Sequence, residues 1–172
     1  MTNAELKKEL SKSLRLKDIK FLSKNAEKED VFSLMFSRDK RCSDNAAWLM
    51  TYLPKTENKF LEQKRNILID AVLTTDNKTR LRLLLNLLER LDYKSEDLRT
   101  DFVDFCLKNS VSLLQSAGVQ VLCLKLAYKQ CVLYDELLSE LYSTLSFIHS
   151  TELSPGVKNQ FQKILSQIES KR

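Results

Sequence analysis

The scarcity of glycine and proline constrains this chain more than any other feature of its sequence. Its 172 residues include two glycines and two prolines, whereas average proteins contain about 7% and 5% of these residues. Hairpins and tight turns depend on them, because glycine reaches left-handed backbone angles and proline fixes its own. Leucine, lysine and glutamate, which favour helices, are abundant instead. The sequence therefore predicts an all-α fold.

Apolar residues recur at intervals of three and four along the chain, the spacing that places side chains on one face of a helix. Leu81, Leu84, Leu85 and Leu88 form one such run. From these runs, and from the capping and breaking residues beside them, we predict a series of helices joined by short connections. They cover residues 3–13, 16–24, 28–36, 43–53, 57–73, 77–91, 95–108, 117–132, 134–149 and 155–169.

The length of the chain suits one domain with its own core. We expect a single helical domain over residues 1–172, in which residues 1–15 form an N-terminal capping helix and residues 16–169 form helix pairs. A membrane span needs about 18 consecutive apolar residues, and no stretch of the sequence approaches this length. The opening MTNAELKKELSKSL is too polar for a signal peptide. We therefore expect a cytoplasmic protein with no membrane partner.

The positive charge of the chain is concentrated near its N-terminus. Residues 1–65 contain 15 lysines and arginines against 10 acidic residues, whereas residues 66–172 contain 13 of each. A basic region can bind nucleic acid or an acidic protein. Solvated helices rich in lysine and glutamate have the same composition, so charge alone does not choose between these interpretations.

Potential helix-capping residues recur at a long, nearly constant interval. Ser43, Asp76, Ser116 and Ser154 are separated by 33, 40 and 38 residues. Their side-chain oxygens can accept a hydrogen bond from the free backbone N–H groups of a first helical turn. Another predicted helix precedes each of them. The sequence thus predicts a repeated unit of helix, turn and capped helix, with a period of about 40 residues.

The two glycines occupy equivalent places in this repeat, in SAGVQ (116–120) and SPGVK (154–158). With two helices per unit and a period near 40, residues 16–169 resemble the HEAT-like, armadillo-type class of α-solenoids. The resemblance implies a right-handed α-α superhelix of about four helix pairs. It also implies that Gly118 and Gly156 let the second helix of a pair approach the first closely, because glycine has no side chain.

In solenoids of this kind, the second helices of successive units line a concave binding face. Lys125 and Lys163 both lie nine residues after their predicted caps. Arg80, Gln120 and Lys158 lie four residues after theirs. We predict a binding surface made of seven basic residues and one aromatic residue: Arg80, Arg82, Arg90, Lys125, Lys129, Lys158, Lys163 and Trp48.

Trp48 has two interpretations. Its neighbours in sequence, such as Ala47 and Leu49, are small or apolar, which is typical of a core residue. Asp44 and Tyr52 lie four residues away on either side, on the same helix face. An exposed tryptophan in such polar surroundings would be an anchor for a partner.

The sequence gives no support for catalytic, cofactor-binding or metal-binding residues, and we predict none. Two distant glycines cannot form a phosphate-binding loop. His149 is the only histidine, and at a predicted helix end it can cap free carbonyls. Zinc has no plausible ligand set without a second histidine or a CxxC motif. The cysteines lie in apolar helical settings, where we expect reduced, buried thiols: Cys42, Cys106, Cys123 and Cys131.

The segment SPGVKN, with Ser154, Lys158 and Asn159, is superficially similar to the serine loop of the fumarase and adenylosuccinate lyase superfamily. It lacks the doubled serine and the methionine of that loop, and enzymes of that superfamily are much longer chains. We therefore do not expect lyase activity.

Two functions remain open from the sequence. The first is a non-enzymatic interaction module or scaffold that binds a protein partner through its concave face. The second is a nucleic-acid-binding protein similar to the HEAT-like DNA alkylation-repair glycosylases, which use aromatic and acidic residues in a cationic channel. Trp48, Tyr52 and Asp44 would take those places here. Polar residues at both ends of the chain favour a monomer or a weak homodimer.

Overall fold

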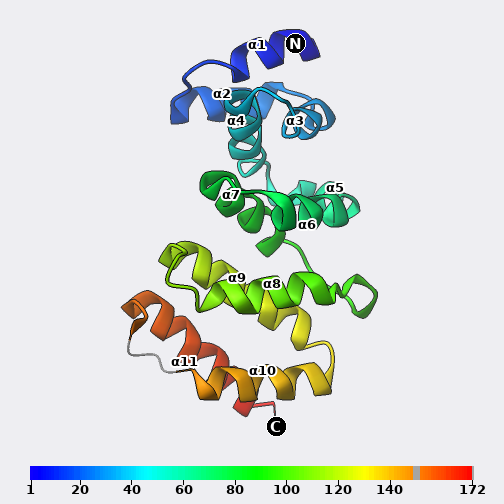
Figure 1. Ribbon diagram of the computed structural model, residues 1–172. Coiled ribbons are helices and arrows are strands. Elements are labelled where there is room, and N and C mark those ends of the chain that lie inside the picture. The colour runs from blue at the N-terminus through cyan, green and yellow to red at the C-terminus, as the bar shows by residue number, and fades with distance from the viewer. Residues whose placement is uncertain (149–151, 172) are drawn as a thin grey trace. The chain divides into compact units, whose positions relative to one another are not determined.

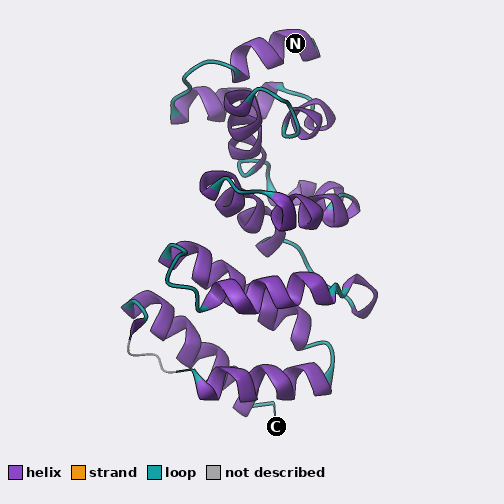
Figure 2. Ribbon diagram, viewed as in Figure 1, coloured by secondary structure: helices purple, strands orange, loops and turns teal. Residues whose placement is uncertain are grey.

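The computed structural model describes residues 1–148 and 152–171, and these residues form helices joined by loops, without a β-strand (Figures 1 and 2). The predicted all-α class is confirmed. The chain divides into two compact units: the first unit is Met1–Arg90 and the second unit is Leu91–Arg172. The His149 prediction lies outside the described residues.

The first unit is built around α4. Its helices are α1 (Asn3–Leu10), α2 (Leu16–Asn25), α3 (Lys28–Leu34), α4 (Lys40–Met50), α5 (Asn58–Gln63), α6 (Arg65–Thr74) and α7 (Lys78–Glu89), with a 3-10 turn at Lys55–Glu57. α4 packs against α1, α2, α3 and α7, and α6 packs against α7. Leu10, Leu49 and Leu84 are among the side chains that this packing buries completely.

The second unit is built around α9. It contains α8 (Thr100–Ser110), α9 (Ala117–Cys131), α10 (Asp135–Phe147) and α11 (Pro155–Glu169), preceded by a 3-10 turn at Ser95–Asp97. α9 packs against each of the other three helices, and α10 packs against α11. Leu124, Leu141 and Phe161, one from each of α9, α10 and α11, belong to one buried apolar cluster. Together the two units contain the four expected helix pairs, α3–α4, α6–α7, α8–α9 and α10–α11.

Two predicted helices are interrupted. Residues 57–73 form two helices because the backbone of Lys64 leaves helical geometry, with φ −101° and ψ 4°. Residues 95–108 begin as a 3-10 turn, and α8 starts only after the extended residues Leu98 and Arg99.

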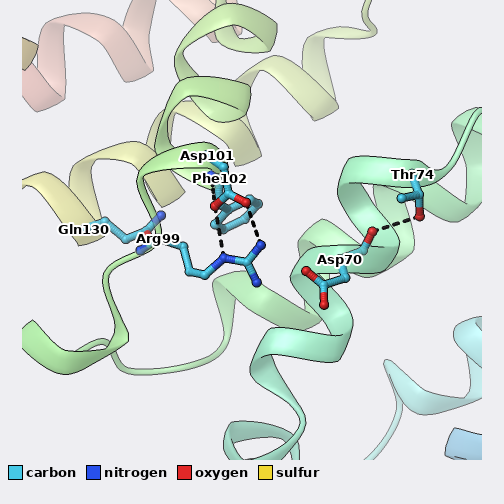
Figure 3. A network of polar contacts seen from close by, with 6 residues as sticks. All are labelled: Asp70, Thr74, Arg99, Asp101, Phe102 and Gln130. Atoms are coloured by element: carbon cyan, nitrogen blue, oxygen red, sulfur yellow. Dashed lines mark hydrogen bonds and ion pairs between the residues drawn. The ribbon is translucent and has the colours of Figure 1, made fainter.

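The start of α8 is held by polar contacts, which Figure 3 shows from close by. The Arg99 guanidinium donates to both carboxylate oxygens of Asp101, at 3.0 and 2.6 Å. Asp101 Oδ1 also accepts from the backbone N–H of Phe102 at 2.8 Å. These hydrogen bonds, that from Arg99 first, lower the pKa of the Asp101 carboxyl. The charged carboxylate thus satisfies a free N–H of the first turn.

The observed caps of the second helices are more regular than the predicted ones. They are Asp39, Asn77, Ser116 and Ser154, spaced by 38, 39 and 38 residues. Ser116 is confirmed as a cap, because its side chain accepts from the backbone N–H of Val119. Ser154 stands at the predicted cap position, but its side chain makes no capping hydrogen bond. The predictions for Ser43 and Asp76 are wrong.

Local hydrogen bonds explain why Asp39 and Asn77 are the caps rather than Ser43 and Asp76. The side chain of Asp39 accepts from the backbone N–H groups of Arg41 and Cys42, so α4 starts earlier than predicted. Ser43 is therefore buried inside α4, where its hydroxyl donates to the carbonyl of Met35 at 2.6 Å. In α7, Asn77 rather than Asp76 accepts from the first-turn N–H groups.

The expectation that the glycines permit close packing is also wrong. Gly118 and Gly156 are both exposed. A Cβ atom added at Gly156 would meet no atom within 4 Å. Both lie in the first turn on the solvent side of their helices, so their repetition reflects the repeated helix start rather than a helix crossing.

Replacing Gly156 with alanine is expected to raise the free energy of unfolding by about 0.5–1 kcal/mol, because alanine restricts the unfolded chain and fits the helix without strain. Urea denaturation followed by circular dichroism would measure the change. A loss of stability of similar size would instead support the close helix packing at Gly156 that the sequence predicted.

Candidate functional site

Counting from the observed caps places Trp48 in register with residues of the other second helices. Nine residues after each cap stand Trp48, Asn86, Lys125 and Lys163. In the first unit, Trp48 and Asn86 line one cavity of about 500 Å³. We call this cavity the α4–α7 groove. Its lining residues are Trp48, Thr51, Tyr52, Thr79, Arg82, Leu83, Asn86, Glu89 and Arg90.

The aromatic side of the groove comes from α4 and the turn that follows it. Trp48 is half-buried, and its neighbours Ala47 and Leu49 are fully buried in the core. Tyr52 is 38% exposed. Trp48 is thus neither a full core residue nor a free surface residue. One part of its side chain is held by the fold and another lines the groove.

The two arginines of the groove differ in what they contact. Arg82 is exposed on α7. Arg90 is half-buried, and its guanidinium donates to Asn58 Oδ1 at 2.7 Å and to the carbonyls of Thr51 and Pro54, both at 3.3 Å. Burial lowers the pKa of the Arg90 side chain. Arg82 is therefore exposed at the groove, whereas Arg90 holds the end of α4.

Arg80, another residue of the predicted surface, does not line the α4–α7 groove. Because Asn77 is the cap of α7, Arg80 lies three residues after it, out of register with Gln120 and Lys158. Its guanidinium donates to the hydroxyl of Ser43 and lies 5.5 Å from the ring centroid of Phe36. Burial lowers the pKa of Arg80.

A second cavity, of about 750 Å³, contains Arg80 and lies at the turns before α4 and α7. Its charges are mixed, with Arg38, Lys40 and Arg80 beside Asp44, Asp70 and Asp76. Asp44 accepts two hydrogen bonds from the amide of Asn77, at 3.0 and 3.1 Å. Arg80 and Asp44 are thus engaged with the fold itself.

The predicted basic residues of the second unit also differ from one another. Lys129 donates to the carbonyl of Leu91 at 3.1 Å. It stands thirteen residues after its cap, as Arg90 does after Asn77. Lys125 and Lys158 are half-buried, and Lys163 is exposed. The predicted series of basic residues therefore mixes internal contacts with exposed charges.

Thr79, Asn86 and Glu89 also line the groove and were not predicted from the sequence. Asn86 could have been found, because the cap at Asn77 places it at the position of Trp48. Counted from Asp76, Asn86 lies ten residues after the predicted cap and is therefore out of register with Lys125 and Lys163. Thr79 and Glu89 carry no sequence signal of their own, since polar residues are common on any exposed helix face.

The cysteines are buried free thiols, as expected from the sequence. Burial raises the pKa of Cys131 to about 11, and it raises the pKa of Cys106 well above its usual range. Protonated thiols are poor nucleophiles and poor metal ligands. Within residues 1–148 and 152–171, no group of three or more histidine, cysteine or acidic side chains is arranged to hold a metal ion.

None of the helices in the described part of the chain is long and apolar enough to cross a bilayer.

Comparison with known proteins places this architecture in a family. A search of curated proteins gives no match. A family model described as a HEAT repeat domain matches residues 3–168, which is almost the full length. Given this match and the repeated helix pairs, the chain belongs to the HEAT repeat domain family.

Proposed function

We propose that this protein is an interaction module whose α4–α7 groove binds a segment of a partner protein. The observation that carries the proposal is that Trp48, Tyr52 and Arg82 line one cavity. Tryptophan, tyrosine and arginine are the residue types that dominate binding energy at protein interfaces. HEAT repeats generally mediate protein interactions, and solenoids present extended surfaces for this purpose.

The lining of the groove indicates what the partner segment contains. An apolar or aromatic side chain would pack on the wall formed by Trp48 and Tyr52. A carboxylate would pair with Arg82, whose planar guanidinium can donate two hydrogen bonds to it. Along α7 the groove extends from Thr79 to Glu89, ten steps of about 1.5 Å or about 15 Å in all. A short linear segment with one apolar and one acidic residue fits this length.

The four buried thiols support a reducing compartment such as the cytoplasm. The buried Leu6 and Leu10 of α1 leave mainly polar side chains outside on that helix, which supports a monomer. Light scattering of the purified protein would show its mass in solution directly.

Trp48 is the only tryptophan of the chain, so selectively excited tryptophan fluorescence reports on the groove. A library of displayed peptides selected on the full chain is expected to yield acidic sequences with an apolar residue that shift the Trp48 emission. Tyr52→Ala and Arg82→Glu should each weaken these peptides by at least about tenfold, and both keep the reporter. Both residues are exposed, so helicity should stay unchanged.

Lys163→Glu is the matched control, because it reverses an exposed charge at the position of Trp48 in the last second helix. It should leave peptide binding unchanged. Peptides that leave the Trp48 emission constant, and bind the Tyr52 and Arg82 variants as tightly as the original chain, would place the binding surface elsewhere and reject the groove.

A further inference from the structure

One face of α2 is left uncovered by the fold. α2 turns Ile19 and Leu22 into the core, where it packs against α4. The other side of the helix exposes two large apolar side chains, Leu16 at 44% and Phe21 at 66%. The exposed residues of this side, which we call the α2 face, are Leu16, Lys17, Lys20, Phe21 and Lys24.

The α2 face is strongly basic. Lys17, Lys20 and Lys24 surround Phe21 at helical spacings of one, three and four residues, and residues three or four apart have Cβ atoms about 5–6 Å from each other. Asp18 is the one acidic residue of α2. It is half-buried, and its carboxylate accepts from the backbone N–H of Arg15 at 2.8 Å. The other acidic side chains near the face are Glu27 and Glu57, which line one hollow together with Lys24.

The surrounding unit has the same sign of charge. Residues 1–90 contain 19 lysines and arginines against 13 acidic residues, whereas residues 91–172 contain 9 against 10. An anionic partner is thus attracted to the first unit as a whole and then to the α2 face. The exposed Phe21 ring adds a flat apolar surface at the centre of this charge.

We propose that the α2 face binds single-stranded nucleic acid, with a base stacked on Phe21 and phosphates held by Lys17, Lys20 and Lys24. Single-strand binding combines these two elements, a basic surface that follows the backbone and an aromatic ring under a base. A membrane-surface helix instead needs a broad apolar face, and the apolar face of α2 is used in the core. Tyr52 of the α4–α7 groove also lines a hollow beside Lys24, whereas Arg82 of the groove does not.

Fluorescence anisotropy with labelled oligo(dT) and oligo(U) tests the proposal on the full chain. Three lysine–phosphate contacts predict that log K falls with log[salt] with a slope of about −2, since each contact contributes about −0.7 on single strands. A triple variant in which Lys17, Lys20 and Lys24 are all replaced with alanine should bring this slope close to zero. Phe21→Ala should weaken binding about 5- to 100-fold and keep the slope, because stacking releases no counterions.

Matched controls come from the second unit. Alanine at Lys108, Lys163 and Lys171 removes the same charge from exposed positions, and Phe147→Ala removes a phenylalanine that is 84% exposed. Neither change should alter binding by more than about twofold, because exposed residues outside a contact contribute little. Arg82→Glu should have no effect here, because Arg82 lines the α4–α7 groove and not the hollow beside Lys24. Failure of this proposal and failure of the groove can therefore be told apart.

Three results would overturn the proposal. The first is an absence of oligonucleotide binding at low salt. The second is an equal loss of binding in the α2 variants and their controls. The third is tighter binding to a duplex or to phosphatidylserine vesicles than to single strands, which would assign the face to a different partner.

Discussion

Replacing Arg90 with methionine is expected to lower the free energy of unfolding of the first unit by about 2 kcal/mol. Hydrogen bonds from a charged donor contribute about 1.5–3 kcal/mol each, and the half-exposed position of Arg90 reduces this contribution. The guanidinium contacts Asn58 and the carbonyls of Thr51 and Pro54. Methionine keeps much of the apolar stem but removes every donor.

Chemical denaturation would give the change in free energy, and hydrogen exchange would locate it. Amides at the end of α4 and in the turn around Pro54 should lose protection first. Arg82→Met is the matched control on the same helix and should change stability by less than about 0.5 kcal/mol, because Arg82 is exposed. Equal losses in the two variants would show that Arg90 does not hold α4.

The largest expected effect is in the second unit, at Phe161. This side chain is 2% exposed and belongs to the buried cluster shared by α9, α10 and α11. Phe161→Ala should lower the free energy of unfolding by about 3–5 kcal/mol, since it removes buried apolar surface and leaves a cavity. Thermal and urea denaturation would measure the loss.

Phe147→Ala serves as the control for this substitution, because Phe147 is 84% exposed and its removal should leave stability almost unchanged. Hydrogen exchange in the Phe161 variant also tests the expected single domain of residues 1–172. We expect protection to fall throughout residues 91–172. A parallel fall in residues 1–90 would support one cooperative domain, and a loss below about 1 kcal/mol would contradict the role of the cluster.

The sequence predicted most helices well because their signal is local. A run such as Leu81 to Leu88 fixes both the helix and its buried face. The caps at Ser43 and Asp76 were wrong because serine, aspartate and asparagine are all good capping residues. Only tertiary packing decides which candidate lies at the helix start. The buried hydrogen bond of Ser43 to Met35 joins two helices, and no local pattern encodes it.

The candidate site was predictable in part. Trp48, Arg82 and Arg90 were all chosen from the sequence, and the structure brings them together in one cavity. The different environments of Arg82 and Arg90 could not be predicted, because the contacts of Arg90 reach residues 32 to 39 positions away. The α2 face could not be predicted from the sequence for a different reason. A lysine-rich segment looks the same in sequence whether its phenylalanine points into the core or into solvent.

The contacts of Arg90 and Lys129 bear on how such repeats change during evolution. Each basic side chain, thirteen residues after its cap, donates to a main-chain carbonyl 38 or 39 residues earlier. Every residue type supplies that carbonyl, so in these two repeats the contact constrains one side chain and leaves the identity of the accepting residue free. The residues that supply these carbonyls can therefore change in sequence while each contact persists. The regular spacing of the helix starts can therefore persist where the sequences of the repeats no longer resemble one another.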